Sequence, residues 1–170
     1  MKIILKSIKN KNINKIILNK IIKLKAEEWN FSKKIQLKWV KSNLQDEDLH
    51  NLLFLDKNLC GYTCLRERTF LLKSKIKKIY YFDTFIITKK YRSVIVNKKR
   101  LSDILMKLNI KKINEKYSLA ILVCNRKLVK FYEKYNWKKS KAFRINKKKN
   151  YIRMVFNPKK IILRNKFITI

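Results

Sequence analysis

The chain has 170 residues, enough for one domain with its own hydrophobic core. Hydrophobic residues make up 46% and aromatic residues 12%, which excludes a disordered basic tail. Lysine and arginine total 45 against 11 aspartate and glutamate, so the formal net charge is +34. This charge predicts non-specific attraction of polyanions. Because most of the basic residues are lysines, it does not by itself predict the reading of nucleic-acid bases.

Hydrophobic segments of the chain are short and interrupted by charge. The opening "MKIILKSIKNKN" lacks the apolar run and the cleavage site of a signal peptide. No stretch approaches the roughly 18 uncharged apolar residues that would span a bilayer. We therefore expect a cytoplasmic protein that has no membrane partner.

The three cysteines, Cys60, Cys64 and Cys124, are odd in number, which favours reduced thiols. His50 is the one histidine, and no second histidine or close third cysteine completes a zinc-binding set. We interpret the cysteines as buried small hydrophobic residues and expect no metal.

In chain order, the first half of the sequence predicts a strand over 3–8 and then a helix from Asn12 with isoleucines at three- and four-residue steps. Ser32 is typical of the N-cap of a second helix. Two β-type runs around Asp56, Lys57 and Asn58 indicate a hairpin, and Gly61 indicates a bulge or a close backbone approach just inside its second strand.

The second half begins with an aromatic, β-branched run, "KIYYFDTFIIT", that predicts another strand. Leu101, Ile104, Leu105 and Leu108 mark one face of a helix, and "SLAILVC" is typical of a strand buried on both faces. "NRKLVKFYEKY" predicts a helix and "NYIRMVFN" a last strand. The order β-α-α-β-β-β-α-β-α-β predicts an α/β fold with a mixed, mostly antiparallel central sheet flanked by helices, in a single domain over residues 1–170.

Two segments resemble the GNAT superfamily of acyl-CoA-dependent N-acyltransferases. In "CNRKLVKFYEKYNWKK", Asn125, Phe131, Tyr132, Glu133, Lys134 and Trp137 match the spacing of the family's late helix, with Asn136 in place of a glycine. "DTFIITKKYRSVIVNKKRLSDILMKL" is similar to the family's strand, pyrophosphate loop and helix. Arg92 matches the first loop position, whereas Ile95 and Asn97 stand where the family has glycines.

The resemblance implies that acetyl-CoA, or another acyl-CoA, is a co-substrate bound by the strand and by the loop. The residues expected to bind it are Phe85, Ile86, Ile87, Arg92, Ser93, Val94, Ile95, Val96, Asn97, Lys98 and Asn125. Asn125 is also placed to cap a helix. Since Ile95 is β-branched, we expect a cradle of backbone N–H groups here only if the loop residues keep helical or bridging φ.

The implied chemistry is direct attack of a primary amine on the thioester, with Tyr132 as general acid for the leaving thiolate. The alternative is that Tyr132 is a buried helix aromatic stacked beside Phe131. Asp83 and Glu67 are candidate general bases, and either is as readily an ion-paired strand residue. His50 is a weaker candidate that we expect at the surface.

The favoured function is transfer of an acetyl group to an amine of a small molecule or sugar, by a monomer or homodimer. An alternative acceptor is a protein N-terminus or lysine. A second alternative is a catalytically inactive GNAT-like fold that binds nucleic acid or another polyanion, because the loop lacks glycines and the chain is strongly basic.

Overall fold

The computed structural model describes residues 1–72, 75–140, 151–159 and 168–169. Its first elements are β1 (Ile3–Lys9), η1 (Asn10–Asn12), α1 (Lys15–Trp29), α2 (Lys33–Asn43), β2 (Leu49–Leu55), β3 (Asn58–Leu72) and β4 (Lys75–Ile87). There follow η2 (Lys89–Tyr91), β5 (Ile95–Val96), β6 (Lys99–Arg100), α3 (Leu101–Lys116), β7 (Ala120–Asn125), η3 (Arg126–Leu128), α4 (Val129–Glu133), β8 (Trp137–Lys139), β9 (Tyr151–Phe156) and β10 (Ile168–Thr169). No helix in these ranges is long and apolar enough to cross a membrane.

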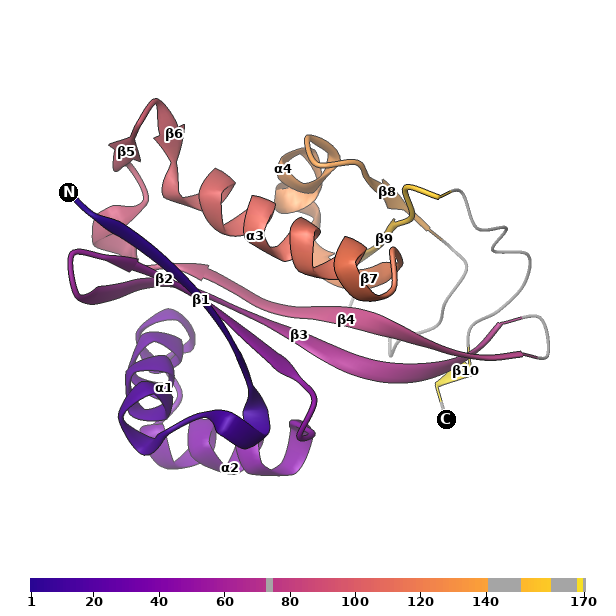
Figure 1. The fold of residues 1–170 in the computed structure, drawn as a ribbon, viewed down its shortest axis with the longest axis horizontal. Coiled ribbons are helices and arrows are strands. Elements are labelled where there is room, and N and C mark those ends of the chain that lie inside the picture. Colours follow the sequence, from indigo (N-terminus) through magenta and orange to yellow (C-terminus); the bar gives the residue numbers. More distant parts are fainter. Residues whose placement is uncertain (73–74, 141–150, 160–167, 170) are drawn as a thin grey trace. The chain divides into compact units, whose positions relative to one another are not determined.

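The main sheet has the strand order β1-β2-β3-β4-β7-β9-β8, and β10 pairs with β3 (Figure 1). β4 and β7 are parallel, whereas the pairs β1–β2, β2–β3, β7–β9 and β8–β9 are antiparallel. The predicted α/β class with a mixed, mostly antiparallel sheet flanked by helices is confirmed. Sequence reasoning missed β8, β10 and the small β5–β6 sheet, because two- and three-residue strands carry too little periodicity to detect.

The chain divides into two compact units. One unit comprises Met1–Arg66 and Thr84–Ile110, and the other comprises Glu67–Asp83 and Lys111–Ile170. The strands β3 and β4 and the helix α3 each run through both units. The single domain over 1–170 stays a prediction.

In the first unit, helices cover both faces of the sheet (Figure 1). On one face, Ile21 and Leu24 of α1 pack with Leu52, Phe54 and other residues of β2, β3 and β4. On the opposite face, Leu101 and Leu105 of α3 pack against a second cluster, made of Leu53, Leu55, Cys60, Ile87 and Val96. The period-two alternation of Leu52 to Leu55 between the clusters explains why this hydrophobic run forms a strand buried on both sides.

Local signals set the ends of the elements in this unit. The Oδ1 atom of Asn14 accepts a hydrogen bond from the N–H of Ile17 at 2.9 Å, so α1 begins after Asn14 and not at Asn12 as predicted. The predicted cap of α2 is confirmed, since Ser32 Oγ accepts from the N–H of Ile35. The Asp56–Lys57 turn is also confirmed, with positive φ at both residues, as the twist of a two-residue hairpin requires.

In the second unit, an aromatic cluster forms the centre of the core. The rings of Tyr132 from α4, Phe82 from β4 and Trp137 from β8 meet edge to face with centroids 5.3–6.2 Å apart. The Phe156 ring from β9 lies 5.6 Å from that of Trp137. The helix predicted in "NRKLVKFYEKY" is shorter than expected, because its first turn is the 3-10 helix η3 and α4 ends at Glu133.

Candidate active site

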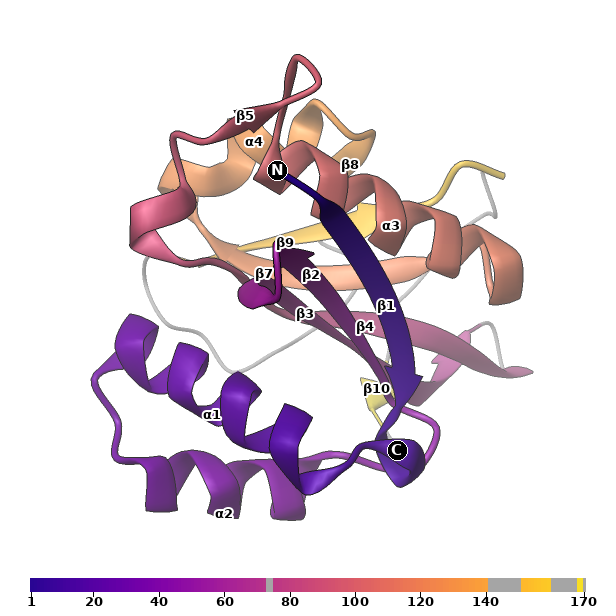
Figure 2. The same ribbon diagram turned by 60° about the vertical axis from the view of Figure 1, so that its left-hand side comes forward.

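The loop that follows β4 is a hairpin, not an open cradle of backbone N–H groups. Ile95 and Val96 pair with Arg100 and Lys99 as short antiparallel strands, and Figure 2 shows this hairpin leading directly into α3. The condition under which we expected a cradle here, helical or bridging φ in the loop, is therefore not met at Ile95. β-branched residues favour the extended conformation that they adopt here.

The tip of this hairpin adopts the conformation for which glycine would be expected. Asn97 and Lys98 have φ of 49° and 61°, in the left-handed region. Asparagine tolerates this region better than other non-glycine residues, and two such residues in sequence make the tight turn that a two-residue hairpin needs. At the tip of the hairpin, Asn97 therefore adopts a left-handed backbone conformation that a glycine would otherwise have provided.

Backbone N–H groups at the start of the loop are engaged within the loop. The N–H groups of Tyr91, Arg92 and Val94 donate to the carbonyls of Thr88, Lys89 and Tyr91, at 2.8–3.3 Å. These three N–H groups therefore form hydrogen bonds that close turns within the loop. The side chains of Ser93, Asn97 and Lys98, and those of Lys99 and Arg100, are exposed. An anion at this loop would thus meet cationic side chains and the N-terminus of the 16-residue helix α3.

Arg92 has an internal role that the sequence did not reveal. Its Nε donates to the carbonyl of Ile87 at 2.9 Å, and its Nη2 lies 2.5 Å from Oε2 of Glu28 on α1. The guanidinium therefore joins the end of β4, the loop and the end of α1. The carbonyl of Ile87, one of the expected contacts of the pantetheine arm, already accepts a hydrogen bond from Arg92.

Thr84 interrupts the regular backbone of β4. Its φ of 58° is unusual for a β-branched residue, and it lies between Asp83 and Phe85, two predicted site residues. Strained positions of this kind often occur at ligand sites, where the surrounding structure holds them. The parallel pairing of β4 with β7 involves only Tyr80 with Ala120 and Tyr81 with Ile121, although both strands continue beyond these pairs.

Tyr132 is buried in the aromatic cluster of the second unit. Burial raises the pKa of its phenol above the ordinary value, and the neighbouring Cys124 raises it further. The phenol keeps its proton at neutral pH, as any tyrosine does, and the raised pKa makes it a weaker acid than an exposed tyrosine. Cys124 is itself buried, and burial raises the pKa of its thiol to about 11.

Glu67 is held between two lysines in the second unit. One carboxylate oxygen lies 3.2 Å from Nζ of Lys78, and the other forms a short contact with Nζ of Lys116. Burial alone would raise the pKa of Glu67, but hydrogen bonds from Lys116, Tyr117 and Lys78 outweigh it and lower the pKa overall. The Glu67 carboxylate therefore stays ionised and paired with Lys78 and Lys116. Asp83 is half-buried on β4 of the same unit.

Asn125 ends β7 and caps the 3-10 helix η3, since its Oδ1 accepts from the N–H of Lys127 at 3.0 Å. The cap that the sequence predicted is confirmed. The candidate residues thus come from both units: Tyr132, Asp83, Glu67 and Asn125 lie in the second unit, and the loop and the end of β4 lie in the first.

His50 is buried, contrary to the prediction that it lies at the surface. Its Nδ1 is 2.9 Å from the hydroxyl of Tyr62 and its Nε2 is 3.0 Å from Oδ1 of Asn10. Burial is the main reason that its pKa falls to about 4, while Asp48 raises and Lys25 lowers it to smaller extents. His50 serves as a neutral hydrogen-bonding residue of the core.

The cysteines behave as predicted. Cys60, Cys64 and Cys124 are free thiols and all three are buried. Within the described residues, no three histidine, cysteine, aspartate or glutamate side chains gather as a metal site would require.

Solved structures with the same arrangement cover almost the whole chain. The GNAT family N-acetyltransferase YhbS from Escherichia coli, in complex with CoA, matches 99% of this chain and 89% of its own with a TM-score of 0.69 at 11% identity. An acyl-CoA N-acyltransferase from Pseudomonas aeruginosa matches 91% of this chain and 99% of its own, with a TM-score of 0.69 at 12% identity. The chain has the GNAT fold.

A third structure with the GNAT fold is the PaiA N-acetyltransferase from Thermoplasma acidophilum in complex with coenzyme A. It matches 92% of this chain and 99% of its own, with a TM-score of 0.60 at 16% identity. No protein-family model matches the sequence, and no curated protein matches it by sequence. The GNAT fold is thus recognisable here from the structure and from short sequence segments.

Proposed function

We propose that this protein is an acyl-CoA-dependent N-acyltransferase that transfers an acetyl group to a primary amine of a small molecule or sugar. The observation that supports this most is the fold, which matches N-acyltransferase structures over nearly the full length of both chains, two of them solved with CoA.

The residues present fit the coenzyme through side-chain charge more than through backbone donors. Lys98, Lys99 and Arg100 precede α3, and exposed ammonium and guanidinium groups suit phosphate oxygens. Ser93 and Asn97 add polar side chains. Phe85 and Ile86 would offer backbone groups to the pantetheine arm, and Val94 and Val96 pack the loop against the core. Ile95 is exposed on the same loop. By resemblance, Asn125 is a further proposed contact of the coenzyme.

In this proposal the acyl-CoA supplies the activated thioester. Tyr132 holds a proton on its phenol oxygen and would give it to the departing thiolate. Asp83 is the proposed base, acting on the amine through water. Glu67 is the less favoured base, because its two lysine partners already stabilise its charge.

Coenzyme binding is the first test. Acetyl-CoA at millimolar concentration should raise the melting temperature, because a ligand that binds the folded state stabilises it. When the correct amine is supplied, free thiol should also be released. The absence of any thermal shift would reject the proposal.

Tyr132→Phe tests the chemistry. It should lower kcat by about a hundredfold and leave the KM for acetyl-CoA nearly unchanged, since general acid catalysis contributes on this order. Tyr135→Phe is the matched control, because Tyr135 lies on the same segment with its ring 5.4 Å from that of Phe131. Equal activity of the two variants would exclude Tyr132 as the acid.

Arg92→Ala should weaken coenzyme binding more than Lys99→Ala does. Glu28→Gln distinguishes how Arg92 acts. If Arg92 serves as an anchor of the loop, Glu28→Gln weakens coenzyme binding as well. If the Arg92 guanidinium instead binds the coenzyme phosphate, Glu28→Gln removes its competing carboxylate and tightens coenzyme binding. Equal effects of Arg92→Ala and Lys99→Ala on coenzyme binding would show that the loop is only a charged turn.

A polyanion-binding module is the second candidate function. The observations that favour it are the net charge of +34 and the engagement of loop N–H groups in internal turns. Filter binding of RNA against salt tests it: micromolar affinity with a steep salt dependence, together with no coenzyme binding, would favour this function over acyl transfer.

A further inference from the structure

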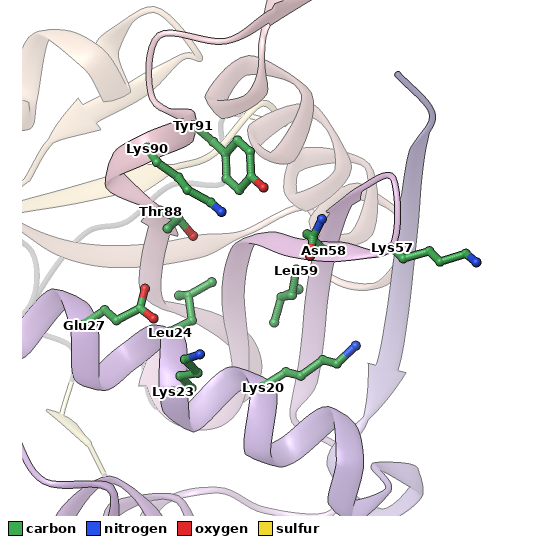
Figure 3. Close-up of a pocket in the computed structure, with 10 residues that line it drawn as sticks. All are labelled: Lys20, Lys23, Leu24, Glu27, Lys57, Asn58, Leu59, Thr88, Lys90 and Tyr91. Atoms are coloured by element: carbon green, nitrogen blue, oxygen red, sulfur yellow. The ribbon is translucent and has the colours of Figure 1, made fainter.

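A hollow in the first unit is lined by lysines from three separate elements. It has a volume of about 220 Å³ and lies between α1, the β2–β3 turn and η2. Lys20 and Lys23 come from α1, Lys57 from the turn and Lys90 from η2. Figure 3 shows Lys20 and Lys23 on α1 and Lys90 extending from the opposite wall, whereas Lys57 points outward at the edge.

The lysines of this hollow take part in none of the ion pairs found among the described residues. Lys20 and Lys90 instead lie over aromatic rings, 6.0 Å from the centroid of Phe54 and 4.7 Å from that of Tyr91. By contrast, lysines elsewhere reach the acids that are present, as Lys9 and Lys11 do with Glu47.

The lining of the hollow defines the kind of ligand that would fit. Leu24 and Leu59 give it an apolar wall, and Asn58, Thr88 and Tyr91 add polar atoms. Glu27 is the one carboxylate of the lining and would oppose an anion. The volume is below the roughly 300–1,000 Å³ of pockets for drug-sized ligands, so a compact ligand fits best.

We propose that the lysine hollow binds the phosphate groups of a small molecule other than the coenzyme. Ammonium groups act as point charges with rotatable donors, and they suit phosphate oxygens that approach from different directions. A diphosphate carries enough charge to balance several ammonium groups, whereas a single carboxylate does not. This proposal does not depend on acyl transfer.

Binding of inorganic pyrophosphate to the full chain tests the proposal, by calorimetry at about 0.15 M salt so that diffuse attraction is screened. Saturable binding at one site is expected. Lys20→Gln/Lys23→Gln should weaken it by about tenfold or more, because each variant side chain loses a charge-assisted hydrogen bond. Lys90→Gln should weaken it as well, and Glu27→Gln should tighten it.

The matched control is Lys38→Gln/Lys41→Gln. These two lysines are also three residues apart on a helix of the same unit, exposed and away from the hollow, so the charge removed is identical. Equal weakening in both double variants would mean diffuse attraction and would overturn the proposal. A lack of saturable binding would do the same. Competition between coenzyme A and pyrophosphate would assign the hollow to the coenzyme instead, which also overturns it.

Discussion

At the scale of single residues, Gly61 shows how closely the core of the first unit is packed. A Cβ atom at Gly61 would lie 2.8 Å from Cδ1 of Ile87 and 3.2 Å from both Cδ2 of Leu105 and Cβ of Leu53. The pairing of β2 with β3 also shifts between Leu53 and Phe54, opposite this glycine. Of the two alternatives predicted for Gly61, the bulge is confirmed, and the atoms that crowd its backbone belong to neighbouring side chains.

Gly61→Ala should reduce the free energy of unfolding by about 1–2 kcal/mol, because overpacking a well-filled core forces its neighbours to move. Urea denaturation measures the change. Asn58→Ala, at the exposed start of the same strand, is the control and should have a smaller effect. A Gly61→Ala variant as stable as the parent would show that the neighbouring side chains move aside at no cost.

His50 makes stability depend on pH. Its pKa is about 4 in the folded chain and about 6.5 when unfolded, so between these values the unfolded state binds a proton that the folded state does not. The His50 contribution is therefore complete above pH 6.5 and is lost as the pH falls toward 4, by about 3 kcal/mol in all.

His50→Gln should remove this part of the pH dependence. The comparison is urea denaturation of both proteins between about pH 7 and pH 4.5, where carboxylates common to both contribute equally. The difference in unfolding free energy between the two proteins should shrink as the pH falls. Parallel curves would contradict the assignment.

At the scale of elements, the β2–β3 hairpin joins two strands of the core through an unfavourable turn residue. Asp56 and Lys57 have φ of 50° and 73°, and Asp56 Oδ1 accepts a hydrogen bond from the N–H of Lys2 at 2.7 Å. Aspartate tolerates the left-handed region, whereas for lysine it costs roughly 1 kcal/mol.

Lys57→Gly should therefore stabilise the protein by about 1 kcal/mol, because Asp-Gly is the preferred pair for this turn. Lys57→Ala removes the same side chain without relieving the backbone, and it is the control. Thermal and urea denaturation would both detect the difference. Equal stability of the glycine and alanine variants would show that the turn is not strained.

At the scale of the whole molecule, the charge of +34 opposes compaction. Eleven acidic residues face 45 lysines and arginines, so ion pairs such as those of Glu28, Glu47, Glu67, Glu115 and Glu133 can neutralise only a small part of the positive charge. The remaining positive charge must be balanced by ions from solution.

Salt should therefore stabilise this protein. Raising sodium chloride from about 20 mM to about 500 mM shortens the Debye length and should raise Tm by several degrees. Differential scanning calorimetry in the two conditions measures it. An unchanged or lower Tm in high salt would mean that screening weakens the ion pairs as much as, or more than, it weakens the repulsion between positive charges.

The sequence by itself determined the order of the larger elements, the caps at Ser32 and Asn125, the turn at Asp56 and Lys57, and the GNAT-like late helix. These features depend on hydrophobic periodicity or on neighbours within a few residues. The tertiary structure decided the rest. It buried His50 against Tyr62, joined Arg92 to Glu28 and surrounded Glu67 with lysines, because such contacts arise between residues that lie far apart in the chain.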